Sequence, residues 1–196
     1  MPSSTTNALI ENYTTTGFHG TSQSAARSIQ LTNFMTSRGE DEWLGNGAYF
    51  FESIFSDGQN DAKNWACVQA WDGSCNSYKI YAVLKAEIVL KKLWDLSSSD
   101  GLKLFEHCRK EVTKLGLKYH GPKNGRRFDN AVIEFVADRI GFDGLRCWFF
   151  IKLDRYSRKM QVMPGIPNVT VLCVRNPGAS ISLDQISSIG EGYINT

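Results

Sequence analysis

The sequence is poor in the features that mark exported and membrane-spanning proteins. Met1 to Tyr13 contains no Lys or Arg and no apolar stretch long enough for a signal peptide, so we expect no export by that route. The most apolar run, Cys147 to Ile151, is far too short to span a bilayer. These absences predict a soluble protein that does not act in a membrane.

Cysteine patterns that indicate a disulfide framework or a zinc site are also missing. The chain has an odd number of cysteines, with no Cys-x-x-Cys pair and no neighbouring His at ligand spacing. We therefore expect reduced thiols, no metal and a cytoplasmic location. The five cysteines are Cys67, Cys75, Cys108, Cys147 and Cys173.

What is present suits an ordinary globular protein. The chain has 196 residues, of which 42% are hydrophobic and 21% charged. A domain of this length buries roughly 70% of its extended-chain surface, so a true core is expected. We predict one domain over residues 1–196.

The order of apolar patterns predicts the fold class. Strands are expected near both ends of the chain with helices between them, without regular alternation, which favours an α+β fold. Ser22 or Ser24 is suited to cap the first helix. The predicted strands are 14–20, 48–51, 78–90, 144–153 and 169–174, and the predicted helices are 24–32, 57–70, 98–115 and 129–139.

Positive charge gathers in one segment, Lys103 to Arg127. It holds eight basic and two acidic residues, a local charge of +6, against +2 for the whole chain. Such a segment could neutralise the phosphates of a nucleic acid. The alternative is a solvated helix face without a partner.

Two short motifs carry the residues suited to chemistry. Phe18-His19-Gly20-Thr21 places an imidazole and a hydroxyl at a strand end, where Gly20 lets a ligand approach the backbone. Roughly 25 residues later, Gly45-Asn46-Gly47-Ala48-Tyr49-Phe50-Phe51 sets two glycines before three aromatic residues. That order predicts a flexible loop that leads into a platform for stacking on a ring.

In this order, the motifs resemble those of the PARP-like ADP-ribosyltransferases, His-Gly-Ser/Thr followed by Gly-x-Gly-x-Tyr-Phe. The resemblance implies an ADP-ribosyltransferase-like domain with a split central sheet, and NAD⁺ as co-substrate. It implies that His19 hydrogen-bonds the nicotinamide ribose, that Gly20 holds the carboxamide and that Tyr49 stacks on the nicotinamide. The full set expected to bind NAD⁺ is His19, Gly20, Thr21, Trp43, Gly47, Tyr49 and Phe50.

The third position of the resemblance departs from the family pattern. Many members have a Glu at the start of a late strand, where its carboxylate holds a ribose hydroxyl and favours the cation. Here that strand begins Pro167-Asn168-Val169, without an acid. We expect Asn168, rather than Glu134 on the preceding helix, to stand at this position, and both stay catalytic candidates beside His19 and Tyr49. Without the Glu, single transfer is expected in place of polymer formation.

The segment Met35 to Gly47 is rich in Gly, Ser and acidic residues and has no apolar period. Loops of this length inside a compact domain are usually functional or disordered. We expect a mobile lid over the donor, with Trp43 folding over the cofactor.

Together these features predict a mono-ADP-ribosyltransferase that acts as a toxin or defence effector. The basic segment favours RNA or DNA as acceptor, a protein acceptor remains an alternative, and an antitoxin is an expected partner of a toxin. A second hypothesis is an NAD⁺-dependent RNA 2′-phosphotransferase, which also carries His-Gly-Thr but needs early phosphate-binding residues, and the early arginines are only Arg27 and Arg38. A third is a catalytically inactive module that binds nucleic acid or a protein partner.

Overall fold

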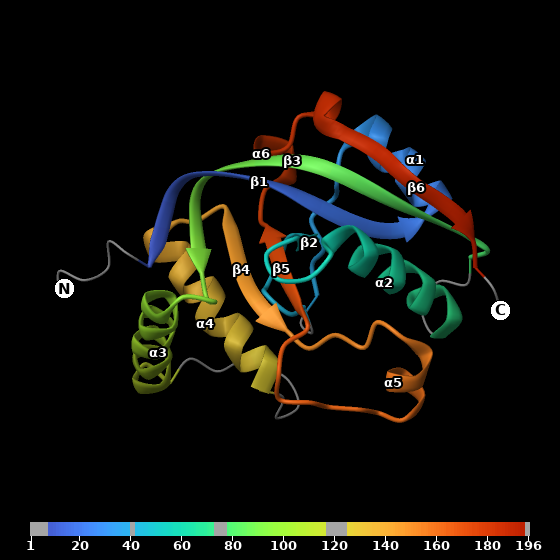
Figure 1. The fold of residues 1–196 in the computed structure, drawn as a ribbon. Helices are drawn as coiled ribbons and strands as arrows, with labels where there is room; N and C mark the ends of the chain where they lie inside the picture. Colours follow the sequence, from blue (N-terminus) through green and yellow to red (C-terminus); the bar gives the residue numbers. More distant parts are fainter. Residues whose placement is uncertain (1–7, 40–41, 73–77, 117–124, 195–196) are drawn as a thin grey trace.

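The computed structural model describes residues 8–39, 42–72, 78–116 and 125–194 (Figure 1). Their strands form one mixed sheet in the order β1-β2-β5-β4-β3-β6, with β1 also paired to β3. The strands are β1 (Leu9–Ser22), β2 (Ala48–Glu52), β3 (Ile80–Asp95), β4 (Gly144–Phe149), β5 (Val169–Val174) and β6 (Ile186–Tyr193).

The sheet consists of two antiparallel halves that meet over short stretches. One half contains β1, β3 and β6, and the other contains β2, β5 and β4. The halves join where Leu93–Asp95 run parallel to β4 and where β1 meets β2 at a single register pair, Phe18 with Phe51. Because β1 and β2 pair only there, they diverge on either side of it.

Helices lie against the sheet (Figure 1). The buried residues form two separate apolar cores. The larger core joins the sheet to α2, α3 and α4, and the smaller one lies under α1. Among the helices described, none is long and apolar enough to cross a membrane. The helices are α1 (Gln23–Thr32), α2 (Gly58–Asp72), α3 (Ser99–Lys114), α4 (Gly125–Ile140), α5 (Arg155–Lys159), α6 (Pro177–Ser180) and the 3₁₀ turn η2 (Leu183–Gln185).

The α+β class and most of the predicted elements are confirmed. β5 has the predicted ends, and Ser22, one of the two expected caps, accepts a hydrogen bond from the Ala25 N–H at 3.2 Å. β1 begins earlier than predicted, at Leu9, because its first residues pair with β3. The prediction that β4 continues to residue 153 is wrong. The Asn168 side chain binds both the N–H and the C=O of Ile151, which takes that backbone out of the ladder.

Sequence analysis did not predict α5 or β6. β6 contains two glycines and two serines, a composition that disfavours strands. It forms nevertheless along the free edge of β3, where register pairs run from Ile80 with Tyr193 to Ala86 with Ile186. Pairing with an existing strand outweighs the weak local preference of this segment.

Candidate active site

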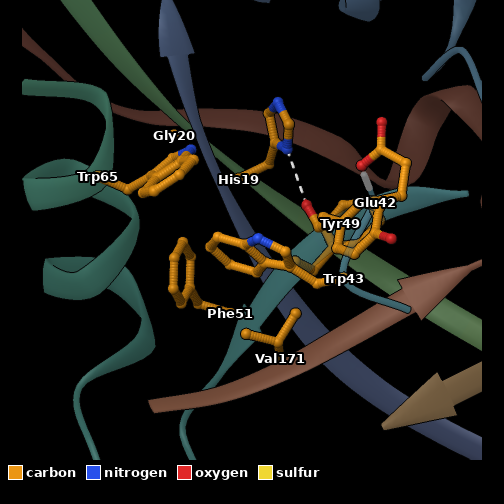
Figure 2. A pocket seen from close by; sticks show the side chains of 9 residues that line it. His19, Gly20, Glu42, Trp43, Tyr49, Phe51, Trp65 and Val171 are labelled. Atoms are coloured by element: carbon orange, nitrogen blue, oxygen red, sulfur yellow. Dashed lines mark hydrogen bonds between the residues drawn. The ribbon is translucent and has the colours of Figure 1, made fainter. Parts of the chain in front are cut away.

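A pocket of about 290 Å³ opens where β1 and β2 diverge (Figure 2). It is bounded by the end of β1, the first residues of β2, α2 and the loop before β2, and mostly apolar side chains form its walls. The lining residues are His19, Gly20, Glu42, Trp43, Tyr49, Phe50, Phe51, Trp65 and Val171. Both sequence motifs therefore contribute to the same cavity.

A hydrogen bond connects the two motifs across the divide between the strands. The Nδ1 atom of His19 lies 2.8 Å from the carbonyl oxygen of Tyr49. A carbonyl oxygen only accepts, so Nδ1 carries the hydrogen. Burial lowers the pKa of His19, which favours the neutral ring. In the neutral tautomer with Nδ1–H, the other nitrogen, Nε2, is an acceptor, and Figure 2 shows it pointing away from Tyr49.

Aromatic packing fixes the His19 ring in this orientation. Its centroid lies 5.3 Å from the Phe34 ring and 5.9 Å from the Phe50 ring. Phe34 and Phe50 also contact each other edge to face, with centroids 4.8 Å apart. The imidazole therefore packs against a pair of touching phenylalanine rings before any ligand binds.

Tyr49 contributes its ring to the pocket while its hydroxyl shapes the preceding loop. The hydroxyl donates to the carbonyl oxygen of Gly45 at 2.6 Å and accepts from the N–H of Leu44 at 2.9 Å. Burial raises the pKa of Tyr49, so the phenol stays protonated. Because the hydroxyl bonds to the loop backbone as donor and as acceptor, the ring face is the part of Tyr49 offered to a ligand.

Both glycines of the second motif are required by the structure. Gly45 has φ of +76°, a conformation that side chains disfavour. A Cβ on Gly47 would lie 2.3 Å from the sulfur of Cys173. These glycines let the loop press against β5 and bring Tyr49 to the pocket.

Gly20 is also explained by packing. A Cβ at this position would lie 1.7 Å from the carbonyl oxygen of Ala62, so α2 can lie against β1 only where the strand has a glycine. This close approach positions Trp65, one turn further along α2, in the pocket wall. Helix packing therefore gives one reason for glycine here, and Gly20 also lines the pocket.

Trp43 closes one side of the pocket. Its ring packs against Trp65 and Phe149, with centroid distances of 5.4 Å and 5.7 Å. The neighbouring backbone is anchored by Asn130, whose amide donates to the Glu42 carbonyl at 2.6 Å and accepts from the Gly45 N–H at 3.2 Å. The end of the predicted lid is thus tied to α4, while residues 40 and 41 lie outside those described.

The remaining predicted site residues lie elsewhere. Thr21 and Gly47 are not among the pocket-lining residues. Asn168 stands at the start of β5 as expected, but its amide is occupied by the Ile151 backbone at 2.8 and 2.9 Å. Glu134 on α4 forms a double hydrogen bond with Arg175, at 3.0 and 2.7 Å, and Arg175 lowers the pKa of this carboxyl although burial opposes the shift.

Sequence reasoning missed four lining residues, Glu42, Phe51, Trp65 and Val171. The apolar three belong to regular elements in which they resemble ordinary core positions. Glu42 lies in a segment with several acidic neighbours, so its sequence context does not single it out. Only the folded arrangement brings these side chains to His19 and Tyr49.

The basic segment is partly neutralised by its own helix. On α3, Arg109 pairs with Glu106 at 2.8 Å, Lys114 with Glu111 at 2.9 Å and Lys103 with Asp100 at 3.0 Å. Lys118, Lys123 and the side chains of Arg126 and Arg127 lie outside the described part of the chain.

The comparisons with known proteins leave the family open. No family model matches the chain, and no solved structure matches it. The chain is similar to the uncharacterized protein MJ0359 of Methanocaldococcus jannaschii, with 24% identity over 191 residues and 85% of each chain covered.

Proposed function

We propose that the pocket binds NAD⁺ and that the protein transfers its ADP-ribose, as a single unit, to a macromolecular acceptor. The observation that carries this proposal is the link between the two motifs. His19 and Tyr49, thirty residues apart, share a hydrogen bond and line one cavity. This is the arrangement that the resemblance to ADP-ribosyltransferases requires of them.

The pocket suits the nicotinamide riboside part of NAD⁺. Its volume of about 290 Å³ is close to the lower limit of small-molecule sites, about 300 Å³. The rings of Trp43, Tyr49 and Trp65 offer faces or edges to a flat heterocycle. The acceptor atom Nε2 of His19 is suited to bind a ribose hydroxyl, because the neutral ring needs a donor there.

These groups would favour cleavage by orientation. Breaking the bond between nicotinamide and ribose develops positive charge on the sugar, as in glycoside cleavage. A rigid imidazole that grips the ribose and aromatic walls that hold the leaving ring reduce the freedom lost on the way to the transition state. A neutral His19 also adds no positive charge beside the developing cation.

The experiment that tests this function measures nicotinamide release from NAD⁺ by the purified protein. We expect release that saturates with NAD⁺ concentration and is abolished in His19→Ala. Binding of NAD⁺ without release would favour the hypothesis of an inactive module, for which the engagement of Asn168 and Glu134 within the protein is the supporting observation.

The acceptor is best sought with NAD⁺ labelled in its adenosine half. We expect the label on RNA or DNA, because the segment Lys103 to Arg127 concentrates positive charge. Label on protein alone would redirect the search to a protein acceptor. A toxin or defence effector should in addition arrest growth when expressed, and His19→Ala should relieve the arrest.

Transfer of a 2′-phosphate is the weaker enzyme hypothesis. It calls for phosphate-binding side chains beside the nucleotide pocket, and neither Arg27 nor Arg38 is among the lining residues. An RNA carrying an internal 2′-phosphate, supplied with NAD⁺, separates the two reactions. Removal of that phosphate would replace the proposed function.

A further inference from the structure

We propose that Glu42 supplies the carboxylate that stabilises the ribosyl cation, from the loop before β2 and not from the late strand. This inference rests on the proposed function and adds a catalytic residue to it. Among the pocket-lining residues that the structure describes, Glu42 is the one with a carboxyl side chain. Figure 2 shows it on the same side of Tyr49 as the His19 ring.

The other candidate carboxylate and amide are already engaged. Asn168 uses both ends of its amide on the Ile151 backbone. Glu134 binds the guanidinium of Arg175 through both oxygens, and breaking that partly buried pair would leave a charge without its partner. Neither residue lines the pocket. A negative charge for the cation must therefore come from another element.

Two contacts hold Glu42 in the pocket wall. Its carbonyl oxygen accepts a hydrogen bond from the amide of Asn130 on α4 at 2.6 Å. Its carboxylate oxygen Oε1 accepts a hydrogen bond from the hydroxyl of Ser37 across the loop. No residue that the structure describes hydrogen-bonds the second oxygen, Oε2. Contacts among the described residues therefore position both the backbone and the side chain of Glu42.

The surroundings strengthen the effect of this charge. Trp43, Tyr49 and Trp65 form apolar walls next to Glu42, and a charge interaction in such a setting is stronger than in water. His19 is neutral in the same pocket, so it does not cancel the charge of Glu42. A fixed carboxylate near the place where positive charge develops is an effective form of electrostatic catalysis.

The reaction step balances without proton transfer to Glu42. The bond between ribose C1′ and the pyridinium nitrogen breaks, and its electron pair leaves with neutral nicotinamide. C1′ then accepts a lone pair from an oxygen or nitrogen of the acceptor, and that atom releases its proton to solvent. Glu42 stabilises the cation between the two events.

The test compares Glu42→Gln with Glu40→Gln, the same chemical change two residues earlier in the same segment. We expect Glu42→Gln to lower the rate constant for nicotinamide release by about 100-fold or more, as loss of an electrostatic contact to the transition state does. The dissociation constant for NAD⁺ should change by less than about fivefold, because the cation exists only in the transition state. Glu40→Gln should retain the wild-type rate.

Two further variants keep the test sharp. Glu42→Asp preserves the charge and should keep more activity than Glu42→Gln, whereas a purely structural role would not distinguish charge from amide. Ser37→Ala frees the carboxylate and should lower the rate less than Glu42→Gln does. The thermal midpoint of each variant, measured in parallel, identifies any loss that comes from unfolding.

The outcomes separate this inference from the function on which it rests. Wild-type protein that releases no nicotinamide overturns the proposed function and this inference with it. An active wild type with an equally active Glu42→Gln variant overturns the role of Glu42 alone. A dead Asn168→Ala or Glu134→Gln variant of unchanged stability, beside an active Glu42→Gln, would return the third position to one of those residues.

Discussion

The strands β1 and β2 carry polar side chains at two places. One place lines the pocket, and the other forms hydrogen bonds within the protein. Beside the pocket, His19 of β1 and Tyr49 of β2 share one hydrogen bond and face a cavity. Further along, Tyr13 of β1 donates to Glu52 of β2 at 3.0 Å. Thr15 adds a second bond to the same carboxylate at 2.8 Å.

The second cluster is completed by Arg146, which connects Glu52 in one half of the sheet to Asp95 in the other. Arg146 of β4 lies 3.9 Å from Glu52 and binds Asp95 of β3 at 2.6 and 3.2 Å. Glu52 is only 1% exposed, and burial raises its pKa. Asp95 is a second acid beside Arg146, and its charge also raises the pKa of Glu52. The protonated form of Glu52 is therefore favoured.

A structural polar cluster and a binding site on the same strands differ in the partners of their polar groups. In the cluster of Glu52, Asp95 and Arg146, protein groups bond to one another across the two halves of the sheet, although Oε2 of Glu52 is buried without a hydrogen-bond partner among the described residues. In the pocket, Nδ1 of His19 and Oε1 of Glu42 bond within the protein, and both residues line a cavity that a ligand can fill. Burial of polar groups alone would not have told the two regions apart.

Replacing Arg146 should break the structural cluster, with the largest effect that we predict. Arg146→Met leaves Asp95 buried without its partner, and removing one member of a buried ion pair costs about 3–5 kcal/mol of unfolding free energy. Urea denaturation followed by circular dichroism measures the loss. NAD⁺ affinity of the protein that remains folded should be unchanged, because Arg146 does not line the pocket. A loss below about 1 kcal/mol would contradict the role that we assign to this arginine.

Replacing His19 should impair the activity of the pocket instead of the structural cluster. His19→Ala removes the group placed to bind the ribose, and we expect nicotinamide release to fall by about 100-fold through lost orientation. His107→Ala is the matched control, since His107 lies exposed on α3. Chromatography of the products measures release, and circular dichroism checks that the variant is folded. Equal activity of the two variants would contradict a function for His19.

Trp43→Ala tests whether this ring is part of the pocket wall that binds NAD⁺. Loss of one aromatic face should weaken NAD⁺ binding by about tenfold, in line with about 1 kcal/mol for an aromatic contact plus its buried area. Calorimetric titration gives the dissociation constant. Trp148 packs against Phe55 away from the pocket, so Trp148→Ala should bind NAD⁺ as the wild type does. If Trp148→Ala weakened binding as much, the ligand would occupy a different surface.

Glu52→Gln tests the protonation state of the structural cluster. The folded-state pKa of Glu52 is raised, so its favourable contribution is complete below the unfolded pKa and is lost as pH rises through the folded pKa. The amide mimics the protonated acid at every pH. The variant should therefore match the wild type near pH 4 and exceed its stability at pH 8. Urea midpoints at both pH values measure the difference, and a variant less stable at pH 8 would show that Glu52 is ionised.

The sequence predicts the elements better than it predicts the site. The ends of β5 could be predicted because strand patterns are local signals, and the meeting of His19 with Tyr49 was expected from the resemblance of the two motifs to those of the ADP-ribosyltransferases. The hydrogen bonding of Asn168 could not be predicted. Its position at a strand start was predicted correctly, but its amide binds the backbone of Ile151. Trp65 and Glu42 become pocket residues only because Gly20 admits α2 and Asn130 anchors the loop.

The smallest effect should come from the lysines of α3. Lys103, Lys110 and Lys114 lie within ion-pair distance of acids on the same helix, at 3.0, 3.8 and 2.9 Å. Exposed pairs of this kind contribute about 0.2–1 kcal/mol at most. Changing all three to Gln should therefore alter the urea midpoint little, and the acids that offset their charge should keep the change in nucleic-acid affinity below about threefold.

The rest of the basic segment provides the contrast. Few acidic residues lie near four of its other basic residues in the sequence, which are Lys118, Lys123, Arg126 and Arg127. Changing these four to Gln therefore removes positive charge that nearby acids do not offset. We expect this variant to bind a short RNA or DNA more weakly and with a shallower salt dependence, because fewer counterions are released. Fluorescence anisotropy at two salt concentrations distinguishes the two variants. Equal losses in both would mean that the ion pairs on α3 open when nucleic acid binds, and no loss in either would point to a protein acceptor.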